Sequence, residues 1–346
     1  MTGKCQISVK SAVIKKVFIK TFGCAQNVAD SERVKAYYWE KGYEFTSDWK
    51  EATEIVINSC VVRESAENRV YGLVNNIKKY NKDIKIILTG CLVGIYKNKI
   101  SGIDEQKNIG FFENLEPIRN KKKAALIPIG SGCDNFCSYC IVPFARGREV
   151  SRKMDDILSE VDEAIRQGFK EVVLIGQNVN SWNENKFYKL LEEVAKKSVE
   201  KISFVSSNPW DFSDELIEVI AKYPNIDRLI HLPFQSGDNE ILKRMNRNYT
   251  QKIYLDLVEK IKSKVDGVRF STDIIVGFPG ETEEAFLNTV DVCQQVGFEI
   301  AYLNKYSPRR GTVSAKLYKD DIPQSEKKRR WNVLNELVNK KIISNI

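Results

Sequence analysis

The chain has 346 residues, of which 42% are hydrophobic and 29% are charged. This balance excludes a largely disordered protein. Charged and polar residues interrupt every apolar run before the roughly 20 residues that a bilayer-spanning helix needs. The N-terminus lacks the apolar stretch and cleavage site of a secretory signal, so we expect a cytoplasmic protein without a membrane contact. The length favours two domains.

The charge is moderately basic. Lys and Arg number 54 against 46 Asp and Glu, which gives a formal net charge of +8. Such a charge permits a polyanionic partner such as RNA but does not demand one. The single histidine, His231, argues against zinc sites with several His ligands and against Cys–His or Ser–His catalysis.

Strand-like and helix-like segments alternate in the first third of the chain. Apolar, β-branched runs span residues 15–21, 54–59 and 84–90, and helical stretches at 30–41 and 64–80 separate them. This alternation is typical of a doubly wound α/β fold with a parallel sheet. Cys24, Cys60 and Cys91 follow the three runs by one to three residues. Because the carboxyl ends of parallel strands lie at one edge, we expect these thiols to lie together there.

A second set of strand and helix signals begins after a basic run at residues 120–123, near which we place a boundary between domains 1–122 and 123–346. Strand-like runs lie at 126–130, 171–177, 202–207, 228–233, 268–278 and 299–306. Six such units are fewer than the eight of a closed β/α barrel, so we expect an open, partial barrel. Ser213 is a candidate N-cap, and the chain ends in a basic, amphipathic helix.

Cys133, Cys137 and Cys140 form a C-x3-C-x2-C cluster directly after the first barrel strand. A disulfide framework is improbable in a cytosolic protein. Without a nearby fourth cysteine or a histidine, the cluster cannot complete a tetrahedral zinc site locally. Three thiolates can instead hold three irons of a 4Fe–4S cluster, and the fourth iron would be open to a cofactor.

The C-x3-C-x2-C motif resembles that of the radical S-adenosylmethionine enzymes, and its surroundings resemble the methylthiotransferases among them. The resemblance covers about residues 15 to 315 and rests on TFGCAQNVADSE, INSCVVRESAENRVYG, GCDNFCSYCIVPFARGREVSR, LIGQNVNSW, MNRNYT and TDIIVGFPGETEEAF. Arg63 and residues 245–249 are most similar to the branch that makes 2-methylthio-N6-isopentenyladenosine (2-methylthio-N6-dimethylallyladenosine) beside the tRNA anticodon. The sequence departs from the usual family pattern at Ala25, Asn208 and Arg310.

The resemblance implies two 4Fe–4S clusters and S-adenosylmethionine as cofactors. We call the implied ligands of the cluster that binds S-adenosylmethionine the barrel cysteines (Cys133, Cys137 and Cys140). The implied ligands of a second, sulfur-donating cluster are the auxiliary cysteines (Cys24, Cys60 and Cys91). Gly176, Gln177 and Asn178 would hold the amino group of S-adenosylmethionine, and residues 277–280 would approach its adenine. The implied reaction begins with reductive cleavage of S-adenosylmethionine to a radical that abstracts the C2 hydrogen of adenosine. The catalytic chemistry is then the cofactor's, and we assign no catalytic side chain.

The implied partners are the anticodon stem-loop of tRNA and an electron donor such as a flavodoxin or ferredoxin, and we expect a monomer. Family members carry a C-terminal RNA-binding TRAM domain, whereas this sequence stops after the basic helix, so we expect that domain to be absent. RNA contacts would then depend on Lys121–Lys123 and on Lys327, Lys328, Arg329 and Arg330. Cys5 and Cys293 match no motif, and we expect no role for them.

Three alternatives stay open at this point. The same chemistry could add a methylthio group to threonylcarbamoyladenosine in tRNA or to an aspartate of a ribosomal protein, although the residues after Cys60 favour the isopentenyladenosine branch. The chain could also be a non-catalytic iron–sulfur or RNA-binding member of the family. The presence of all six cysteines argues against that reading.

Overall fold

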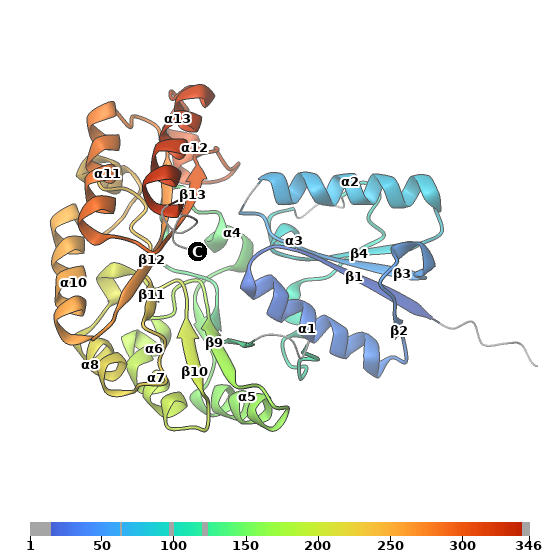
Figure 1. Cartoon of the computed structure of the whole chain (residues 1–346). Coiled ribbons are helices and arrows are strands. Elements are labelled where there is room, and N and C mark those ends of the chain that lie inside the picture. The colour runs from blue at the N-terminus through green and yellow to red at the C-terminus, as the bar shows by residue number, and fades with distance from the viewer. Residues whose placement is uncertain (1–14, 63, 97–99, 120–123, 341–346) are drawn as a thin grey trace, which may run out of the picture.

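The computed structural model describes residues 15–62, 64–96, 100–119 and 124–340. A parallel sheet with helices on both faces forms the N-terminal part, and a larger partial barrel lies beside it (Figure 1). The expected α/β architecture is therefore confirmed. Within the described residues, no helix is long and apolar enough to cross a membrane.

The N-terminal sheet has the strand order β2-β1-β3-β4-β5, and all neighbouring strands are parallel. Its strands are β1 (Lys16–Phe22), β2 (Glu44–Phe45), β3 (Glu54–Ser59), β4 (Lys85–Gly90) and β5 (Glu105–Gln106). The long helices α1 (Ala25–Glu40) and α2 (Glu64–Tyr80) cover opposite faces (Figure 1). Because both faces are covered, β3 and β4 are buried over almost their whole length.

The three predicted strands and α2 are found where they were expected, and the short edge strands β2 and β5 are additional. Helix α1 begins at Ala25, five residues before its predicted start at Asp30. The cause is local, because the backbone N–H of Cys24 donates to Oδ1 of Asn27 over 3.4 Å and caps the helix. The buried residues of its first turn, Gln26 and Asn27, are polar, so the sequence did not indicate a helix facing the core.

The barrel contains the six predicted strands. They are β6 (Ala125–Pro128), β9 (Glu171–Ile175), β10 (Lys201–Phe204), β11 (Leu229–His231), β12 (Arg269–Val276) and β13 (Ile300–Lys305). Hydrogen bonds join them into two three-stranded parallel sheets, β6-β9-β10 and β11-β12-β13. Just after β10, the backbone N–H of Ser206 donates to Nδ1 of His231 on β11 over 3.0 Å. A side chain thus accepts the hydrogen bond that a backbone carbonyl would accept between paired strands. Within the described chain, β6 and β13 have no strand on their outer sides, which leaves the barrel open.

Helices cover the outside of the barrel (Figure 1). The longer ones are α5 (Met154–Arg166), α7 (Phe187–Ala195), α8 (Asp214–Lys222), α10 (Gln251–Lys264), α11 (Glu283–Val296) and α13 (Gln324–Leu334), which continues as a π-helical turn over Asn335–Asn339. The short elements are α3 (Cys91–Ile95), α4 (Val142–Arg146), α6 (Trp182–Asn185), α9 (Asn239–Arg244), α12 (Val313–Leu317), β7 (Gly130–Ser131) and β8 (Val150–Ser151). The Ser213 hydroxyl accepts from the N–H of Leu216 over 3.3 Å, so the predicted N-cap of α8 is confirmed.

Helix α4 joins the two parts of the molecule. It follows the barrel cysteines in the chain, yet Ile141 at its start is buried in the core under the N-terminal sheet, and Ala145 packs against the same core. In Figure 1, α4 lies between the barrel and α3 of the N-terminal part. The loop that carries Cys140 is therefore anchored in the core of the other half.

Buried ion pairs also cross between the two parts. Glu160 on α5 pairs with Arg33 of α1 over 2.9 Å and with Arg119. Elsewhere, Glu67 on α2 pairs with Arg309 over 2.8 Å. Removing one partner of such a pair would leave an uncompensated buried charge. These contacts therefore fix the N-terminal sheet relative to the barrel.

The predicted RNA contacts of the basic C-terminal helix are corrected by the positions of its side chains. The side chain of Lys327 is 0% exposed and lies 2.6 Å from Asp320, and Arg330 is buried against Glu281 at 2.7 Å. Arg329 pairs with Glu326 at 2.7 Å. Of the four residues predicted to contact RNA, only Lys328 is exposed and has no carboxylate partner among the described residues. The helix packs on the barrel through these charges, so Lys327 and Arg330 cannot reach phosphates. Residues 121–123 lie outside the described residues.

Candidate iron–sulfur and S-adenosylmethionine site

The auxiliary cysteines lie at the carboxyl ends of three neighbouring strands. Cys24 caps α1 two residues after β1, Cys60 directly follows β3, and Cys91 directly follows β4 as the first residue of α3. Since β1, β3 and β4 are adjacent and parallel, their carboxyl ends share one edge of the sheet. Cys60 and Cys91 are buried, whereas Cys24 is exposed.

The environment of Cys91 favours the thiolate. A hydrogen bond with the Cys60 thiol and the positive charge of Arg146 lower the pKa of Cys91 to about 6, against the effect of burial. Nε of Arg146 donates to Sγ of Cys91 over 3.0 Å. The same thiol–thiol hydrogen bond, together with burial, raises the pKa of Cys60 above its usual range. Because the thiolate is the metal-binding form, Cys91 is prepared to act as a ligand.

The barrel cysteines lie on the loop between β7 and α4. The backbone N–H of Cys140 donates to the carbonyl of Cys137 over 2.9 Å, which closes a turn. Ser138 ties the loop to the C-terminal end of α9, since its N–H donates to the carbonyl of Met245 and its hydroxyl donates to the carbonyl of Arg244. Burial raises the pKa of both Cys133 and Cys140 to about 12. These two thiols would therefore lose their protons on binding a metal.

Arg247 lies behind this loop. Its side chain is buried, its Nη1 lies 3.5 Å from Sγ of Cys137, and Nη1 also donates to Oδ1 of Asn208 over 3.1 Å. The guanidinium packs over the ring of Trp210 at 4.6 Å. Each set of cysteines thus has a buried arginine next to one of its sulfur atoms.

A single ion is a poor fit to this arrangement. Among the described residues, no three His, Cys, Asp or Glu side chains converge closely enough to hold one metal ion. A mononuclear site draws all its ligands to about 2.3 Å or less from one centre, whereas the thiolates of an iron–sulfur cluster each bind a different iron. Each set supplies three soft sulfur donors, which are the ligands that iron–sulfur clusters take.

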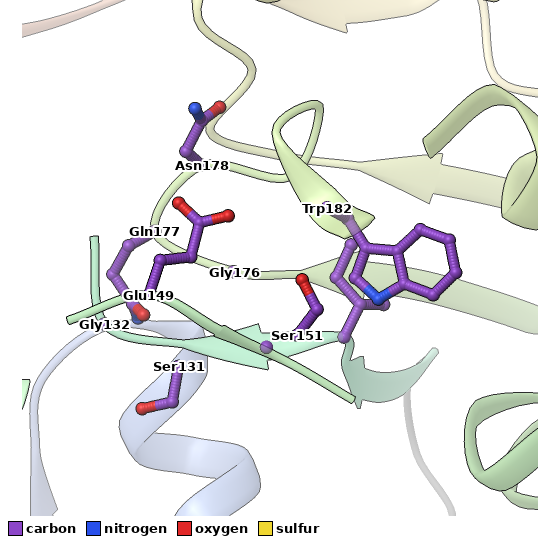
Figure 2. Close-up of a pocket in the computed structure, with 10 residues that line it drawn as sticks. Ser131, Gly132, Glu149, Ser151, Gly176, Gln177, Asn178 and Trp182 are labelled. Atoms are coloured by element: carbon purple, nitrogen blue, oxygen red, sulfur yellow. The ribbon is translucent and has the colours of Figure 1, made fainter. Parts of the chain in front are cut away.

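A pocket beside the barrel cysteines contains the residues predicted to hold S-adenosylmethionine. Gly176, Gln177 and Asn178 extend from the end of β9 and line it together with Gly132, the residue before Cys133 (Figure 2). Gly132 has a φ of 78°, and a Cβ at this position would lie 2.0 Å from the carbonyl oxygen of Arg148. Only glycine therefore permits the tight turn that leads into the cysteine loop.

The polar atoms of this pocket fit an ammonium group. Oε1 of Gln177 and Oδ1 of Asn178 are buried and accept no hydrogen bond from the described parts of the chain. Nδ2 of Asn178 donates to Asp211 over 2.7 Å, which orients its amide. Buried acceptors of this kind need a donor, and an ammonium offers three N–H groups. The pocket therefore fits the amino end of an amino-acid cofactor such as S-adenosylmethionine.

Glu149 is a pocket residue that the sequence analysis missed. It lies in the same pocket (Figure 2). Its carboxylate accepts from the hydroxyl of Ser181 over 2.5 Å. Burial raises the pKa of this carboxyl group. In the sequence it is one acidic residue in the basic segment RGREVSR, and that contrast was the only signal available.

Residues 277–280 form the turn after β12. Gly277 and Gly280 have φ values of 70° and 79°, and added Cβ atoms would lie 2.3 Å from Cγ of Lys327 and 2.1 Å from Nη1 of Arg244. The N–H of Gly277 donates to the buried Glu281 carboxylate over 2.6 Å. Packing within the protein thus explains both glycines, and the contact with adenine stays a prediction.

Of the two remaining cysteines, only Cys293 belongs to the described residues. Cys293 is buried in the barrel core, where desolvation raises the pKa of its thiol to about 12. Cys5 lies outside the described residues. A buried thiol of this kind behaves as a small apolar side chain.

Family models match both parts of the chain. The model described as the Radical SAM superfamily matches residues 127–293, and the one described as Uncharacterized protein family UPF0004 matches residues 16–111. The first match includes the barrel cysteines and the pocket residues after β9. The second includes all three auxiliary cysteines.

Several relatives are similar over most of the chain, and each is named tRNA-2-methylthio-N(6)-dimethylallyladenosine synthase. The relative from Thermotoga petrophila is 41% identical over 94% of this chain and 83% of its own length. The relative from Clostridium perfringens is 39% identical over 97% and 85%, and that from Staphylococcus epidermidis is 41% identical over 92% and 70%.

Solved structures of similar fold are distant in sequence. The radical S-adenosylmethionine methyltransferase TsrM from Kitasatospora setae has a TM-score of 0.63 at 13% identity, over 87% of this chain and 74% of TsrM. The cobalamin-dependent radical enzyme OxsB has a TM-score of 0.58 at 11% identity, over 95% of this chain and 56% of OxsB. At these identities the likeness supports the fold alone.

Proposed function

Because the chain belongs to the tRNA-2-methylthio-N6-dimethylallyladenosine synthase family of radical S-adenosylmethionine enzymes, we propose that it adds a methylthio group to C2 of N6-isopentenyladenosine next to the anticodon of tRNA. The observation that carries this proposal is the joining of two cysteine triplets by α4, which leaves the barrel loop and packs into the core beside the auxiliary cysteines. Insertion of sulfur at an unactivated carbon needs both a radical source and a sulfur source.

We assign one 4Fe–4S cluster to each triplet. The barrel cysteines would hold the cluster that binds S-adenosylmethionine, and the auxiliary cysteines would hold the cluster that provides sulfur. When bound, these groups supply the radical and the sulfur, which no side chain can provide. Reconstituted protein should contain about eight irons, and replacing the three barrel cysteines by Ala should leave about four. Full iron in that triple variant would contradict the assignment.

The pocket residues would bind and orient S-adenosylmethionine. The carboxylate of Glu149 and the unpartnered oxygens of Gln177 and Asn178 would accept from its ammonium group. Asp211 would hold the Asn178 amide in place, since it accepts from Nδ2. The side chain of Trp182 closes one wall of the pocket, and its indole N–H donates to the carbonyl of Arg152 over 3.0 Å.

The remaining assignments follow from this function. The substrate would be the anticodon stem-loop of tRNA, and the site of action the cytoplasm. The reductive step needs an external electron, for which a flavodoxin or ferredoxin is suited.

We place the domain boundary at residue 122. The apolar cores on its two sides are separate, apart from Ile141 and Ala145, which pack into the N-terminal core. We propose a monomer.

Nucleoside mass spectrometry tests the proposal. A strain without this gene should accumulate N6-isopentenyladenosine and lack its 2-methylthio form, and the wild-type gene should restore the modification. The Cys60→Ala gene should not restore it. Loss of methylthiolated threonylcarbamoyladenosine, or of the modified ribosomal aspartate, would identify one of the alternative substrates. Unchanged modification of all three would indicate a non-catalytic protein.

A further inference from the structure

Arg146 contacts one member of the auxiliary set although it belongs to the segment of the barrel cysteines. It is the last residue of α4, six positions after Cys140. Its Nε donates to Sγ of Cys91 over 3.0 Å, and its Nη2 pairs with Oδ2 of Asp30 over 2.6 Å. The side chain is only 3% exposed. A side chain from the segment of the barrel cysteines is therefore buried against one of the auxiliary cysteines.

The surroundings hold this guanidinium in place from both sides. Asp30 lies on α1, and its other carboxylate oxygen accepts from Nε2 of Gln26 over 3.2 Å. On the opposite side, α4 is pressed against α3, whose first residue is Cys91. The planar fork of Arg suits this dual contact, which the single ammonium of Lys could not reproduce.

A hydrogen bond to a ligand sulfur has a known physical effect on an iron–sulfur cluster. One-electron reduction adds one negative charge, which a nearby cation and an N–H donor stabilise. Hydrogen bonds to sulfur and net charge are accordingly among the factors that set the potential. Groups that contact a ligand also fix its orientation.

We propose that Arg146 is a positioning residue that orients the Cys91 thiolate and raises the reduction potential of the auxiliary cluster. This inference rests on the proposed function, because it requires the auxiliary cysteines to hold a cluster. The proposal also couples the two parts of the molecule. Helix α4 follows the barrel cysteines in the chain and carries the side chain that sets the potential of the auxiliary cluster. Any displacement of α4 would change the contact with Cys91.

The test isolates the auxiliary cluster by replacing the three barrel cysteines with Ala in the full chain. Arg146→Gln and Arg146→Lys are then added separately, and each protein is reconstituted without oxygen. Iron content is measured first, and the midpoint potential is measured by titration monitored with electron paramagnetic resonance. Arg148→Gln is the matched control, because Arg148 lies two residues away with a side chain that is 76% exposed.

We expect Arg146→Gln to shift the potential to a more negative value and Arg146→Lys to give a smaller shift, because Lys retains the charge but loses the fork. The control should not shift it. Full iron with an unchanged potential in Arg146→Gln would overturn the proposal. If Arg146→Gln does not assemble a cluster, the potential of Arg146→Lys is used instead. Full iron with an unchanged potential in that variant would then overturn the proposal.

The unfolding temperature of the iron-free proteins separates positioning from simple stability. Cluster loss in Arg146→Gln, with iron-free protein as stable as the control, supports positioning. The proposal would be overturned if Arg146→Lys had a much lower unfolding temperature but an unchanged reduction potential. Arg146 would then only stabilise the fold through its ion pair with Asp30. If the protein that lacks only the three barrel cysteines binds no iron although Arg146 is intact, the proposed function with two clusters is contradicted instead.

Discussion

Gly94 and Ala145 hold α3 and α4 in backbone contact across the two halves of the molecule. A Cβ on Gly94 would lie 2.0 Å from the carbonyl oxygen of Ala145, so the two helices can approach this closely only with glycine at that position. Cys91 begins α3 and the barrel cysteines precede α4. The distance between the two sets of thiols therefore depends on this contact.

We expect Gly94→Ala to separate α3 from α4 and to weaken iron binding by the auxiliary cysteines. Overpacking of this kind costs roughly 1–3 kcal/mol. Thermal unfolding and iron content after reconstitution measure the two effects. Gly72→Ala on α2 is the control, because its Cβ would meet no atom within 4 Å and the change should stabilise the helix by roughly 0.5–1 kcal/mol. Equal iron content in the Gly94 and Gly72 variants would show that the contact does not matter for the site.

Cys137→Ala and Cys60→Ala should fail at different steps. The first variant should not cleave S-adenosylmethionine, because the iron that binds it would be lost. The second should still produce 5′-deoxyadenosine but add no sulfur to tRNA. Chromatography of the nucleoside product and mass spectrometry of tRNA, on the same samples, measure both steps. Cys293→Ala, a change in the barrel core, serves as the control for loss of a thiol outside both sites. Parallel loss of both products in the two variants would contradict the division of roles.

The strands and the cysteine positions could be predicted because their signals are local. A β-branched run followed by cysteine within three residues places the thiol at the strand end, whatever the rest of the chain does. The contacts of Arg146 had no such signal, since Cys91 and Asp30 lie 55 and 116 positions away in the sequence. The prediction that Arg330 contacts RNA failed for the same reason, because its buried partner Glu281 lies far from it in the sequence.

Glu149→Gln should weaken binding of S-adenosylmethionine to reconstituted protein about tenfold or more, as expected for loss of a charged hydrogen-bond partner. Burial raises the pKa of Glu149, so this carboxyl group gains a proton at a higher pH than an exposed glutamate. Wild-type affinity should therefore fall as the pH is lowered through that raised pKa. The affinity of the Gln variant should be flat over the same range. Calorimetric titration at several pH values measures both.

The same shift fixes the sign of the effect on stability. Because the folded state favours the protonated carboxyl, stability from Glu149 is present at low pH and is lost as the pH rises through the raised pKa. Glu149→Gln should thus be no less stable than wild type at neutral pH, which separates a binding defect from misfolding. Glu171→Gln, an exposed change at the start of β9, is the control. A parallel pH dependence in wild type and Glu149→Gln would assign the titration to another group.

Lys327→Met should destabilise the barrel by about 2 kcal/mol, in the range for a lost hydrogen bond to a charged group. Nζ of Lys327 donates to Asp320 and, over 3.1 Å, to the carbonyl of Tyr306, and its stem packs against Gly277. The exposed neighbour Lys328 has no such contacts among the described residues, so Lys328→Met should change stability by less than about 0.5 kcal/mol. Thermal unfolding compares the two single variants directly.

The same pair of variants tests how the C-terminal helix relates to RNA. Each phosphate contact contributes about 0.9 to the slope of log affinity against log salt for a duplex. Lys327 is buried, so Lys327→Met should leave the salt slope for a tRNA anticodon stem-loop unchanged at temperatures where the variant is folded. Lys328→Met should lower the slope by up to about one unit if RNA lies along this helix. A slope reduced by Lys327→Met alone would mean that the helix leaves the barrel when RNA binds. Unchanged slopes in both variants would move the RNA contact away from the helix, toward the carboxyl edge of the N-terminal sheet, where the auxiliary cysteines lie.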